Sequence, residues 1–331
     1  MTLAQSVLAG DRLSLARLLT YVENDTPEGQ AALNALFPHT GRAHLIGVTG
    51  APGTGKSSLV NQLALQYRKQ EKRVAIVAVD PSSPFTGGAV LGDRVRMRDL
   101  AGDKGVFIRS MASRGSLGGL AQATAGVAQV FDAAGFDVIL IETVGAGQSE
   151  VDIARLAHTT LVVEAPGLGD DIQAIKAGIL EIADIIVINK ADRAGADSAE
   201  RALKSMLDLA HPVHKIFTHH GQALAAGAPA ASSPNASLWI PLIRRTVATD
   251  GAGLPELIES IQLHAVYLRH SGDWARRERV RLSVEFDLFI QKMLVERFRA
   301  SVPEGVLDQT LDLIQQRVLS PREAVNKLME E

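Results

Sequence analysis

The spacing of apolar positions changes along the chain and divides it into segments of different character. Over the first forty residues the apolar positions recur at helical spacing, until Pro38 and Gly41 end the pattern. From His44 onward, short runs of β-branched residues alternate with helical stretches, which is typical of βαβ units. Such units predict a doubly wound, mostly parallel α/β sheet. The expected strands are residues 46–49, 74–80, 106–109, 136–142, 159–164, 185–189 and 213–217.

Two later segments break this alternation. Residues 218–237 are rich in Ala, Gly, Ser and Pro and predict a flexible loop. After about Leu268, apolar positions such as Phe286 and Leu294 return among alternating charges, which indicates a helical domain or a dimerisation arm. We therefore expect an N-terminal helical extension, an α/β domain and a C-terminal helical dimerisation region. Their expected bounds are residues 1–41, 42–267 and 268–331.

The composition narrows the class of protein. Of the 331 residues, 46% are hydrophobic but only 4% are aromatic, so Val, Ile, Leu and Ala must fill the core, as in a buried parallel sheet. The formal net charge of -3 gives no sign of nucleic-acid or membrane-surface binding. The absence of cysteine excludes disulfides, thiolate metal sites and a cysteine nucleophile. No stretch resembles a membrane span or a leader, so we expect a cytoplasmic protein.

The most specific signal is a glycine-rich run that matches the phosphate-binding P-loop pattern in full. It follows a predicted strand and precedes a predicted helix. Its glycines allow several backbone N–H groups to point at phosphate oxygens, and the helix N-terminus adds a partial positive charge. We expect Lys56 to reach the β- and γ-phosphates and the Ser57 hydroxyl to bind Mg²⁺. The run and its extension are Gly50, Ala51, Pro52, Gly53, Thr54, Gly55, Lys56, Ser57 and Ser58.

A second motif indicates which base the bound nucleotide carries. An apolar run ends in Asn189-Lys190-Ala191-Asp192, which resembles the guanine-recognition motif Asn-Lys-x-Asp of GTPases. The Asp192 carboxylate can accept two hydrogen bonds, from guanine N1–H and the 2-amino group, whereas adenine offers neither donor. We expect the Lys190 stem to pack on the base and Asn189 to brace the P-loop. Backbone donors to the guanine carbonyl are expected at Val247 and Ala248, after a further strand-like run.

Three carboxylates are candidates for the Mg²⁺ site. Asp80 and Glu142 each end a predicted strand, and Asp93 lies in a Gly- and Pro-bearing stretch that we expect to act as a switch. Mg²⁺ prefers hard oxygen ligands and keeps several waters, so these groups fit as ligands or as partners of bound water. Glu142 opens a run similar to the Asp-x-x-Gly element of GTPases, in which the Gly145 N–H is expected to sense the γ-phosphate. Taken singly, each carboxylate also fits a solvated strand end.

The expected catalytic set lacks one usual member. Many GTPases orient the attacking water with a Gln directly after the switch glycine, but here that position is Ala146, and Gln148 lies two residues further on. We therefore expect slow intrinsic hydrolysis, about 10⁻⁴ to 10⁻² per second, which a partner or a rearranged switch accelerates. The set comprises Lys56, Asp93, Glu142 and Gly145.

Long segments around these carboxylates resemble one family in particular. They are residues 80–88, 91–94 and 142–150. Together with the P-loop and the Asn189 motif, they resemble the accessory GTPases of methylmalonyl-CoA mutase, which belong to the SIMIBI class of P-loop GTPases. Some members of this family were labelled arginine/ornithine transport-system kinases. The resemblance runs from about Leu8 into the C-terminal helices.

The resemblance implies a function and partners. It implies a GTP-hydrolysing homodimer that binds a cobalamin-dependent acyl-CoA mutase, gates the loading of adenosylcobalamin and helps to eject damaged cofactor. It also implies an additional switch in which Asp170, Gln173 and Lys176 relay the nucleotide state to the mutase. From the residues alone, this segment fits equally well a capped helix start with a solvated face. Methylmalonyl-CoA, isobutyryl-CoA and 2-hydroxyisobutyryl-CoA mutases are all compatible clients.

Two other functions stay open, a nucleotide-dependent kinase of a transport system and a metallochaperone GTPase. The sequence has no signature of a second substrate pocket for a kinase, and neither cysteine nor a His-rich N-terminus for a metallochaperone. The clustered histidines fit solvated loop residues better than a metal site; they are His211, His214, His219 and His220. The arginines near the expected switch fit either surface ion pairs or contacts with phosphate or a partner; they are Arg94, Arg96, Arg98, Arg109 and Arg114.

Overall fold

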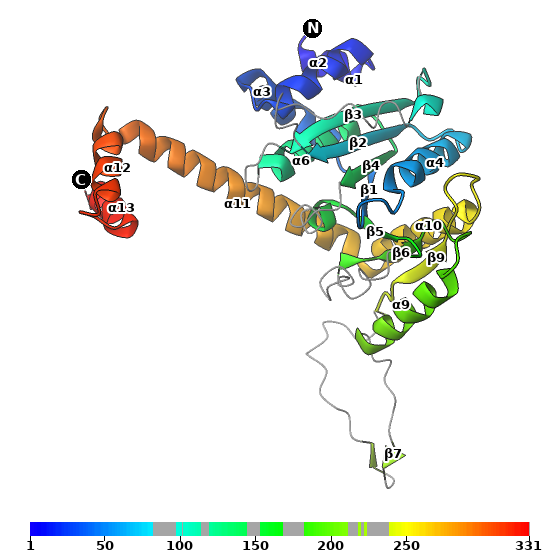
Figure 1. Cartoon of the computed structure of the whole chain (residues 1–331). Coiled ribbons are helices and arrows are strands. Elements are labelled where there is room, and N and C mark those ends of the chain that lie inside the picture. The colour runs from blue at the N-terminus through cyan, green and yellow to red at the C-terminus, as the bar shows by residue number, and fades with distance from the viewer. Residues whose placement is uncertain are drawn as a thin grey trace. The chain divides into compact units, whose positions relative to one another are not determined.

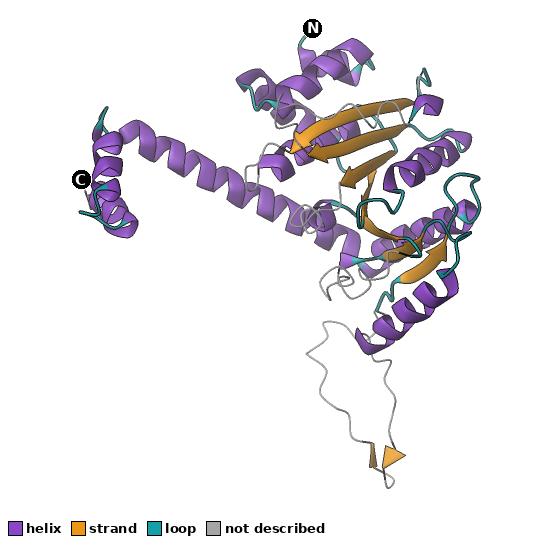
Figure 2. Cartoon of the chain, viewed as in Figure 1, coloured by secondary structure: helices purple, strands orange, loops and turns teal. Residues whose placement is uncertain are grey.

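The chain divides into two compact units, Met1–Arg279 and Val280–Glu331. The computed structural model describes residues 1–81, 97–100, 102–113, 119–143, 153–167, 182–210, 218–219, 222–223 and 238–330. Figure 1 labels the helices and strands along the chain, and Figure 2 distinguishes them by type. Within the described residues, no helix combines the length and the apolarity that crossing a membrane requires.

A seven-stranded parallel sheet forms the centre of the first unit (Figure 2). Its strand order is β3-β2-β4-β1-β5-β6-β9, so the chain winds outward from β1 in both directions. This arrangement confirms the predicted doubly wound α/β fold. The strand expected at residues 213–217 lies outside the described residues. The strands are β1 (His44–Thr49), β2 (Val74–Pro81), β3 (Val106–Ser113), β4 (Val138–Thr143), β5 (Thr159–Glu164), β6 (Ile185–Ile188) and β9 (Leu242–Arg245), with a separate antiparallel pair β7 (Thr218–His219) and β8 (Gln222–Ala223).

Helices cover both faces of this sheet because its strands are apolar on both sides. On one face, α4 and α10 pack against side chains such as Val48 and Leu140. On the opposite face, α6 and the N-terminal helices pack against residues such as Ile139, and α9 packs against Ile186. The first unit is therefore a layered α/β/α structure. These helices are α4 (Lys56–Lys69), α6 (Gly119–Ala133), α9 (Ala196–Ala210) and α10 (Leu254–Ser271), and a 3-10 turn η2 (Arg98–Leu100) lies beside α4.

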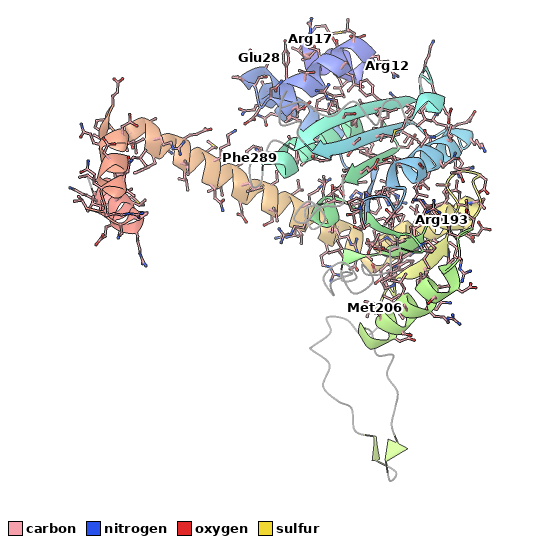
Figure 3. All side chains as sticks on the ribbon, in the orientation of Figure 1. Arg12, Arg17, Glu28, Arg193, Met206 and Phe289 are labelled. Carbon is pink, nitrogen blue, oxygen red and sulfur yellow. The ribbon has the colours of Figure 1, made fainter. Side chains whose placement is uncertain are left out.

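The first forty residues form three capped helices. Side chains of Thr2, Asp11 and Thr26 accept hydrogen bonds at their N-termini. Arg12, labelled in Figure 3, donates to the carbonyl oxygen of Val106 at 2.8 Å and so fixes this layer to the edge strand β3. The helices are α1 (Leu3–Leu8), α2 (Arg12–Glu23) and α3 (Pro27–Leu36), followed by the 3-10 turn η1 (Phe37–His39).

The second unit is helical and has almost no core of its own. Among its described residues, Ala324 alone is buried. Large apolar side chains are exposed instead, for example Phe286 at 64% and Leu294 at 59%, and Phe289 projects from the same helix in Figure 3. The helices are α11 (Asp273–Ser301), which begins in the first unit, α12 (Val306–Gln315) and α13 (Pro321–Glu330).

Candidate nucleotide-binding site

Neighbouring strands end side by side at the carboxyl edge of the sheet, where open α/β proteins bind their ligands. The Cα partners Val48 and Glu142 align β1 with β4, and the partners Thr49 and Val162 align β1 with β5. β6 pairs with β5 in turn. The glycine-rich loop after β1 therefore begins between the end of β4 and the end of β5.

Three glycines of this loop have positive φ, and at two of them a side chain would also collide with neighbouring atoms. φ is +137° at Gly50 and +93° at Gly55, where other residues are strained. A Cβ at Gly50 would lie 2.1 Å from the carbonyl oxygen of Val163, and a Cβ at Gly55 would lie 2.5 Å from Nδ2 of Asn189. α4 begins directly after Gly55 and has no side-chain cap, so its first N–H groups can serve an anion.

Lys56 is a buried cation at this helix start. Its Nζ donates to the carbonyl oxygens of Gly50 at 2.7 Å and Ala51 at 3.0 Å. Thr54 closes the same loop by donating through Oγ1 to the Ala51 carbonyl at 2.9 Å. An ammonium group in this position can form charge-assisted hydrogen bonds with the phosphates of a nucleotide.

Ser57 and Glu142 form an oxygen pair beside the loop. Ser57 Oγ donates to Glu142 Oε1 at 2.6 Å, and the Glu142 side chain is buried at the end of β4. A hydroxyl and a carboxylate are hard oxygen donors, so this pair fits Mg²⁺. Asp80 lies near the end of the adjacent strand β2, and its side chain is not among those described. Asp93 lies outside the described residues.

Asn189 connects the phosphate loop with the loop after β9. It is buried, and its Nδ2 donates to the carbonyl oxygen of Thr54 at 2.9 Å. Its Oδ1 accepts from Thr246 Oγ1 at 3.2 Å and from the Ala248 N–H at 3.1 Å. The N–H groups of Val247 and Ala248, expected to face a guanine carbonyl, are thus both engaged within the protein, that of Val247 within its own turn.

Lys190 and Asp192 complete the second motif and differ in their contacts. The Lys190 backbone is left-handed, with φ 56°, and its Nζ donates to the carbonyl oxygen of Gly53 at 2.5 Å. Asp192 is exposed and, within the described part of the chain, makes no ion pair. Lys190 therefore adds a second tie between the motif and the loop, while the Asp192 carboxylate is open to a ligand.

Other expected site residues are placed elsewhere or are not described. Arg109 donates from Nε to Glu23 of α2 at 3.1 Å, so it is one half of a structural ion pair and not a phosphate ligand. Among the described residues, no group of three or more His, Cys, Asp and Glu is arranged to hold a metal ion. Only the backbone is described for Arg98 and His219. Outside the described residues lie Asp93, Gly145, Asp170, Gln173, Lys176, Arg94, Arg96, Arg114, His211, His214 and His220.

A second polar cluster, missed by sequence reasoning, lies at the amino edge of the sheet. Asp184, directly before β6, accepts from Arg277 through both oxygens, at 2.7 and 2.8 Å. His264 of α10 contacts both Asp184 and the first residue of β5. Its Nε2 is 3.3 Å from Asp184 Oδ1, and its Nδ1 is 2.9 Å from Thr159 Oγ1. Thr159 Oγ1 also lies 2.8 Å from His44 Nε2. We call these five residues the amino-edge cluster.

The environment of this cluster shifts the pKa values of its buried groups. Burial is the main cause that lowers the pKa of His44 to about 3, and the nearby charge of Arg269 acts in the same direction. Burial alone would raise the pKa of Asp184, but the contact with His264 and the two hydrogen bonds from Arg277 outweigh it, so this pKa is lowered. The cluster therefore holds a neutral imidazole and an ionised carboxylate at neutral pH.

A phosphate loop tied to an Asn-Lys-x-Asp motif at the carboxyl edge of a parallel sheet is how P-loop GTPases hold GTP, and the first unit has this architecture. Comparison with known proteins identifies the group within that class. The family model described as methylmalonyl-CoA mutase-associated GTPase MeaB matches residues 15–302, and the chain belongs to this family. It is accordingly a GTPase.

Individual relatives agree with this assignment. GTPase ArgK of Escherichia coli is 34% identical over 99% of this chain and 96% of its own length. The methylmalonic aciduria type A homolog, mitochondrial, of Mus musculus is 31% identical over 83% of this chain and 61% of its own length. The crystal structure of a protein named LAO/AO transport system kinase has a TM-score of 0.68 and 27% identity, covering 99% of this chain and 95% of that one.

Proposed function

We propose that this GTPase is a chaperone of a cobalamin-dependent acyl-CoA mutase, with methylmalonyl-CoA mutase as its client in the cytoplasm. The observation that carries the proposal is the family match over residues 15–302, because that family is described by its association with this mutase. The name of the mouse relative, which refers to methylmalonic aciduria, supports the same client. GTP hydrolysis would gate the loading of adenosylcobalamin and help to protect or reactivate the mutase.

Hydrolysis at this site would depend on positioning and charge, without a covalent intermediate on the protein. Lys56 and the N-terminus of α4 stabilise the charge that develops on the phosphate oxygens when water attacks the γ-phosphate. Ser57 and Glu142 are the residues that would hold Mg²⁺, with Asp80 and Asp93 in support. When bound, the metal neutralises part of the phosphate charge.

Residues outside the phosphate loop would recognise the guanine base and signal the nucleotide state. Asp192 would accept two hydrogen bonds from the guanine edge, and its exposed carboxylate supports this role. Gly145 would sense the γ-phosphate. Asp170, Gln173 and Lys176 would then pass the nucleotide state to the mutase.

The second unit supports a homodimer as the working form. A helical unit with one buried side chain among its described residues cannot stabilise itself through a core. Its exposed apolar side chains, such as Met293 at 61% and Leu311 at 61%, are the kind that subunit interfaces cover. We propose that a second copy of the chain covers them, and sedimentation of the purified protein at several concentrations tests this.

Retention on immobilised mutases tests the client. The full chain, loaded with GDP or with a non-hydrolysable GTP analogue, is passed over each of the three candidate mutases. The proposal expects retention on the methylmalonyl-CoA enzyme that differs between the two nucleotides. The relay variant Lys176→Ala should lose this difference, whereas the matched surface variant Lys204→Ala on α9 should keep it. Equal, nucleotide-independent retention on all three enzymes would refute the client assignment.

A nucleotide-dependent kinase is the alternative function, because the solved relative is named a transport system kinase. Following the labelled γ-phosphate of GTP separates the two activities. A GTPase chaperone releases the label as inorganic phosphate, and addition of the mutase changes the rate. Transfer of the label to an acceptor molecule would favour the kinase.

A further inference from the structure

The end of β4 is held on both faces of the sheet, by one residue within the P-loop and by the residue directly before it. Ser57, within the P-loop motif, donates through Oγ to Glu142 Oε1 at 2.6 Å. Thr143 donates through Oγ1 to Oγ1 of Thr49, the residue directly before the loop, at 3.2 Å. Because successive side chains of a strand point to opposite faces, Glu142 lies on the α4 face and Thr143 on the α6 face.

The threonine pair is buried within the sheet. Thr49 is 0% exposed and Thr143 is 2% exposed, so their hydroxyls bond to each other without competition from bulk solvent. The two bonds add to the backbone ladders of β4 with β1 and β2, and each joins a side chain at the end of β4 to a residue in or next to the P-loop. Together they fix the side chains of Glu142 and Thr143 relative to the P-loop on both faces of the sheet.

We propose that Thr49 and Thr143 are positioning residues that hold the end of β4, and through the chain the sensor residue Gly145, relative to the P-loop. Gly145, the sensor under the proposed function, follows Thr143 by only two residues in the chain, so the position of Thr143 limits where Gly145 can lie. The inference goes beyond the mutase assignment: it rests on GTPase activity and on the proposed role of Gly145, and it needs no particular client.

The ratio of the affinity for a GTP analogue to the affinity for GDP separates this role from ordinary stabilisation of the sheet. Cross-strand threonine pairs also stabilise sheets, so a lower melting temperature alone says nothing about sensing. GDP and GTP share the base, the sugar and the first two phosphates, and only GTP carries the γ-phosphate. A positioning defect therefore weakens binding of a GTP analogue and leaves GDP binding nearly unchanged.

Isosteric variants provide the test. In the full chain with magnesium, Thr49→Val and Thr143→Val should each weaken the non-hydrolysable GTP analogue about three- to tenfold, the range for one lost buried hydrogen bond, and GDP by less than about twofold. The value of kcat should fall with the analogue affinity. Thr143→Ser, which keeps the hydroxyl, should restore both. The double variant should resemble either single variant, because one bond is lost in each case.

Control variants distinguish the possible failures. Thr160→Val removes a buried threonine hydroxyl on β5 that has no hydrogen-bond partner in the described part of the chain, and it should leave the affinity ratio unchanged. Gly145→Ala should lower the ratio. If Gly145→Ala leaves the ratio unchanged, the proposed sensor is wrong. If it lowers the ratio but the valine variants weaken both nucleotides equally, weaken neither, or act additively, the positioning role is overturned. Should Thr49→Val fail to fold, Thr143→Val and Thr143→Ser decide the question.

Discussion

The carboxyl and amino edges of the central sheet both bury charged side chains, yet their hydrogen bonds are arranged differently. At the carboxyl edge, Lys56 bonds to loop carbonyls, and the Asp192 carboxylate is exposed. At the amino edge, Asp184 is buried, and Arg277 and the Thr160 N–H donate to its oxygens. At the same edge, the ring of Trp274 stacks on that of His158, with 3.9 Å between the ring centroids.

The two edges differ in what surrounds the buried charge, and this surrounding structure indicates which edge can bind a ligand. The amino-edge cluster uses its polar groups in internal bonds and joins the starts of β1, β5 and β6 to α10 and to the first turn of α11. The carboxyl edge instead presents helix N–H groups and glycine backbone. Variants at the carboxyl edge should therefore change nucleotide affinity and turnover, and variants at the amino edge should change the free energy of unfolding.

The largest effect is expected for Lys56→Ala. Loss of the cation beside the phosphates should lower kcat about 10²- to 10³-fold, as for removal of one strong electrostatic donor. The free energy of unfolding without nucleotide should fall by at most about 3 kcal/mol, because Nζ bonds to the carbonyls of Gly50 and Ala51 and hydrogen bonds to charged groups contribute about 1.5–3 kcal/mol. Steady-state phosphate release and urea unfolding measure the two quantities. A variant that unfolds readily but hydrolyses GTP normally would reverse the assignment.

Asp184→Asn should act on stability instead. It leaves the partly buried guanidinium of Arg277 without its carboxylate, which is expected to lower the free energy of unfolding by about 3 kcal/mol. The affinity for GTP should stay within about twofold of the original. Glu200→Gln, which removes surface ion pairs with Lys204 and Arg245, is the matched control and should change stability by less than about 1 kcal/mol. Weaker GTP binding at unchanged stability would contradict the structural role of the cluster.

The amino edge also predicts a pH dependence of stability. The folded-state pKa of His44, about 3, lies below its ordinary value of 6.5, so the folded protein keeps this imidazole neutral. Below pH 6.5 the unfolded chain binds a proton that the folded chain does not bind. The contribution is complete above that pH and falls by about 1.4 kcal/mol per unit as the pH drops towards the folded pKa.

His44→Gln should remove this term. Urea unfolding at pH 6 and pH 5 should show a stability difference smaller by about 1.2 kcal/mol in the variant than in the original chain. The exposed His39, changed to Gln, is the control and should leave the difference unaltered. Identical pH slopes for His44→Gln and the original chain would rule out a His44 that stays neutral in the folded protein.

The smallest effect is the difference in GTP affinity expected between variants of two glycines in the phosphate loop. Gly53→Ala and Gly55→Ala both place a side chain at positive φ, but only at Gly55 would the Cβ meet Asn189, at 2.5 Å. Displacing Asn189 breaks its bond to the Thr54 carbonyl, so Gly55→Ala should weaken GTP binding about tenfold more than Gly53→Ala does. Equal losses, measured by fluorescent-nucleotide titration, would show that the Asn189 tie does not support the loop.

The carboxyl edge was predictable because its signals are local in the sequence. The P-loop and the Asn-Lys-x-Asp motif are each contiguous and each follows an apolar strand, so both the parallel fold and the site emerge from short segments. The sequence could not show that Val247 and Ala248 engage their N–H groups within the protein, since turn hydrogen bonds depend on tertiary contacts.

The amino edge was not predictable for the opposite reason. Its members lie between residues 44 and 277, and none belongs to a recognisable motif. Only the strand order brings His44, Thr159 and Asp184 to one edge. Arg109 illustrates the same limit, because its partner Glu23 lies in a separate N-terminal helix. The Thr49–Thr143 bond likewise required the register of β1 with β4.

Competition between GTP and ATP for the purified full chain, in the presence of magnesium, tests the central claim most directly. The Asp192 carboxylate should pair with guanine and find no donors on adenine, so GTP should bind at least about a hundredfold more tightly than ATP. Equal affinity for the two nucleotides would contradict guanine recognition at the carboxyl edge and, with it, the functional contrast between the two edges of the sheet.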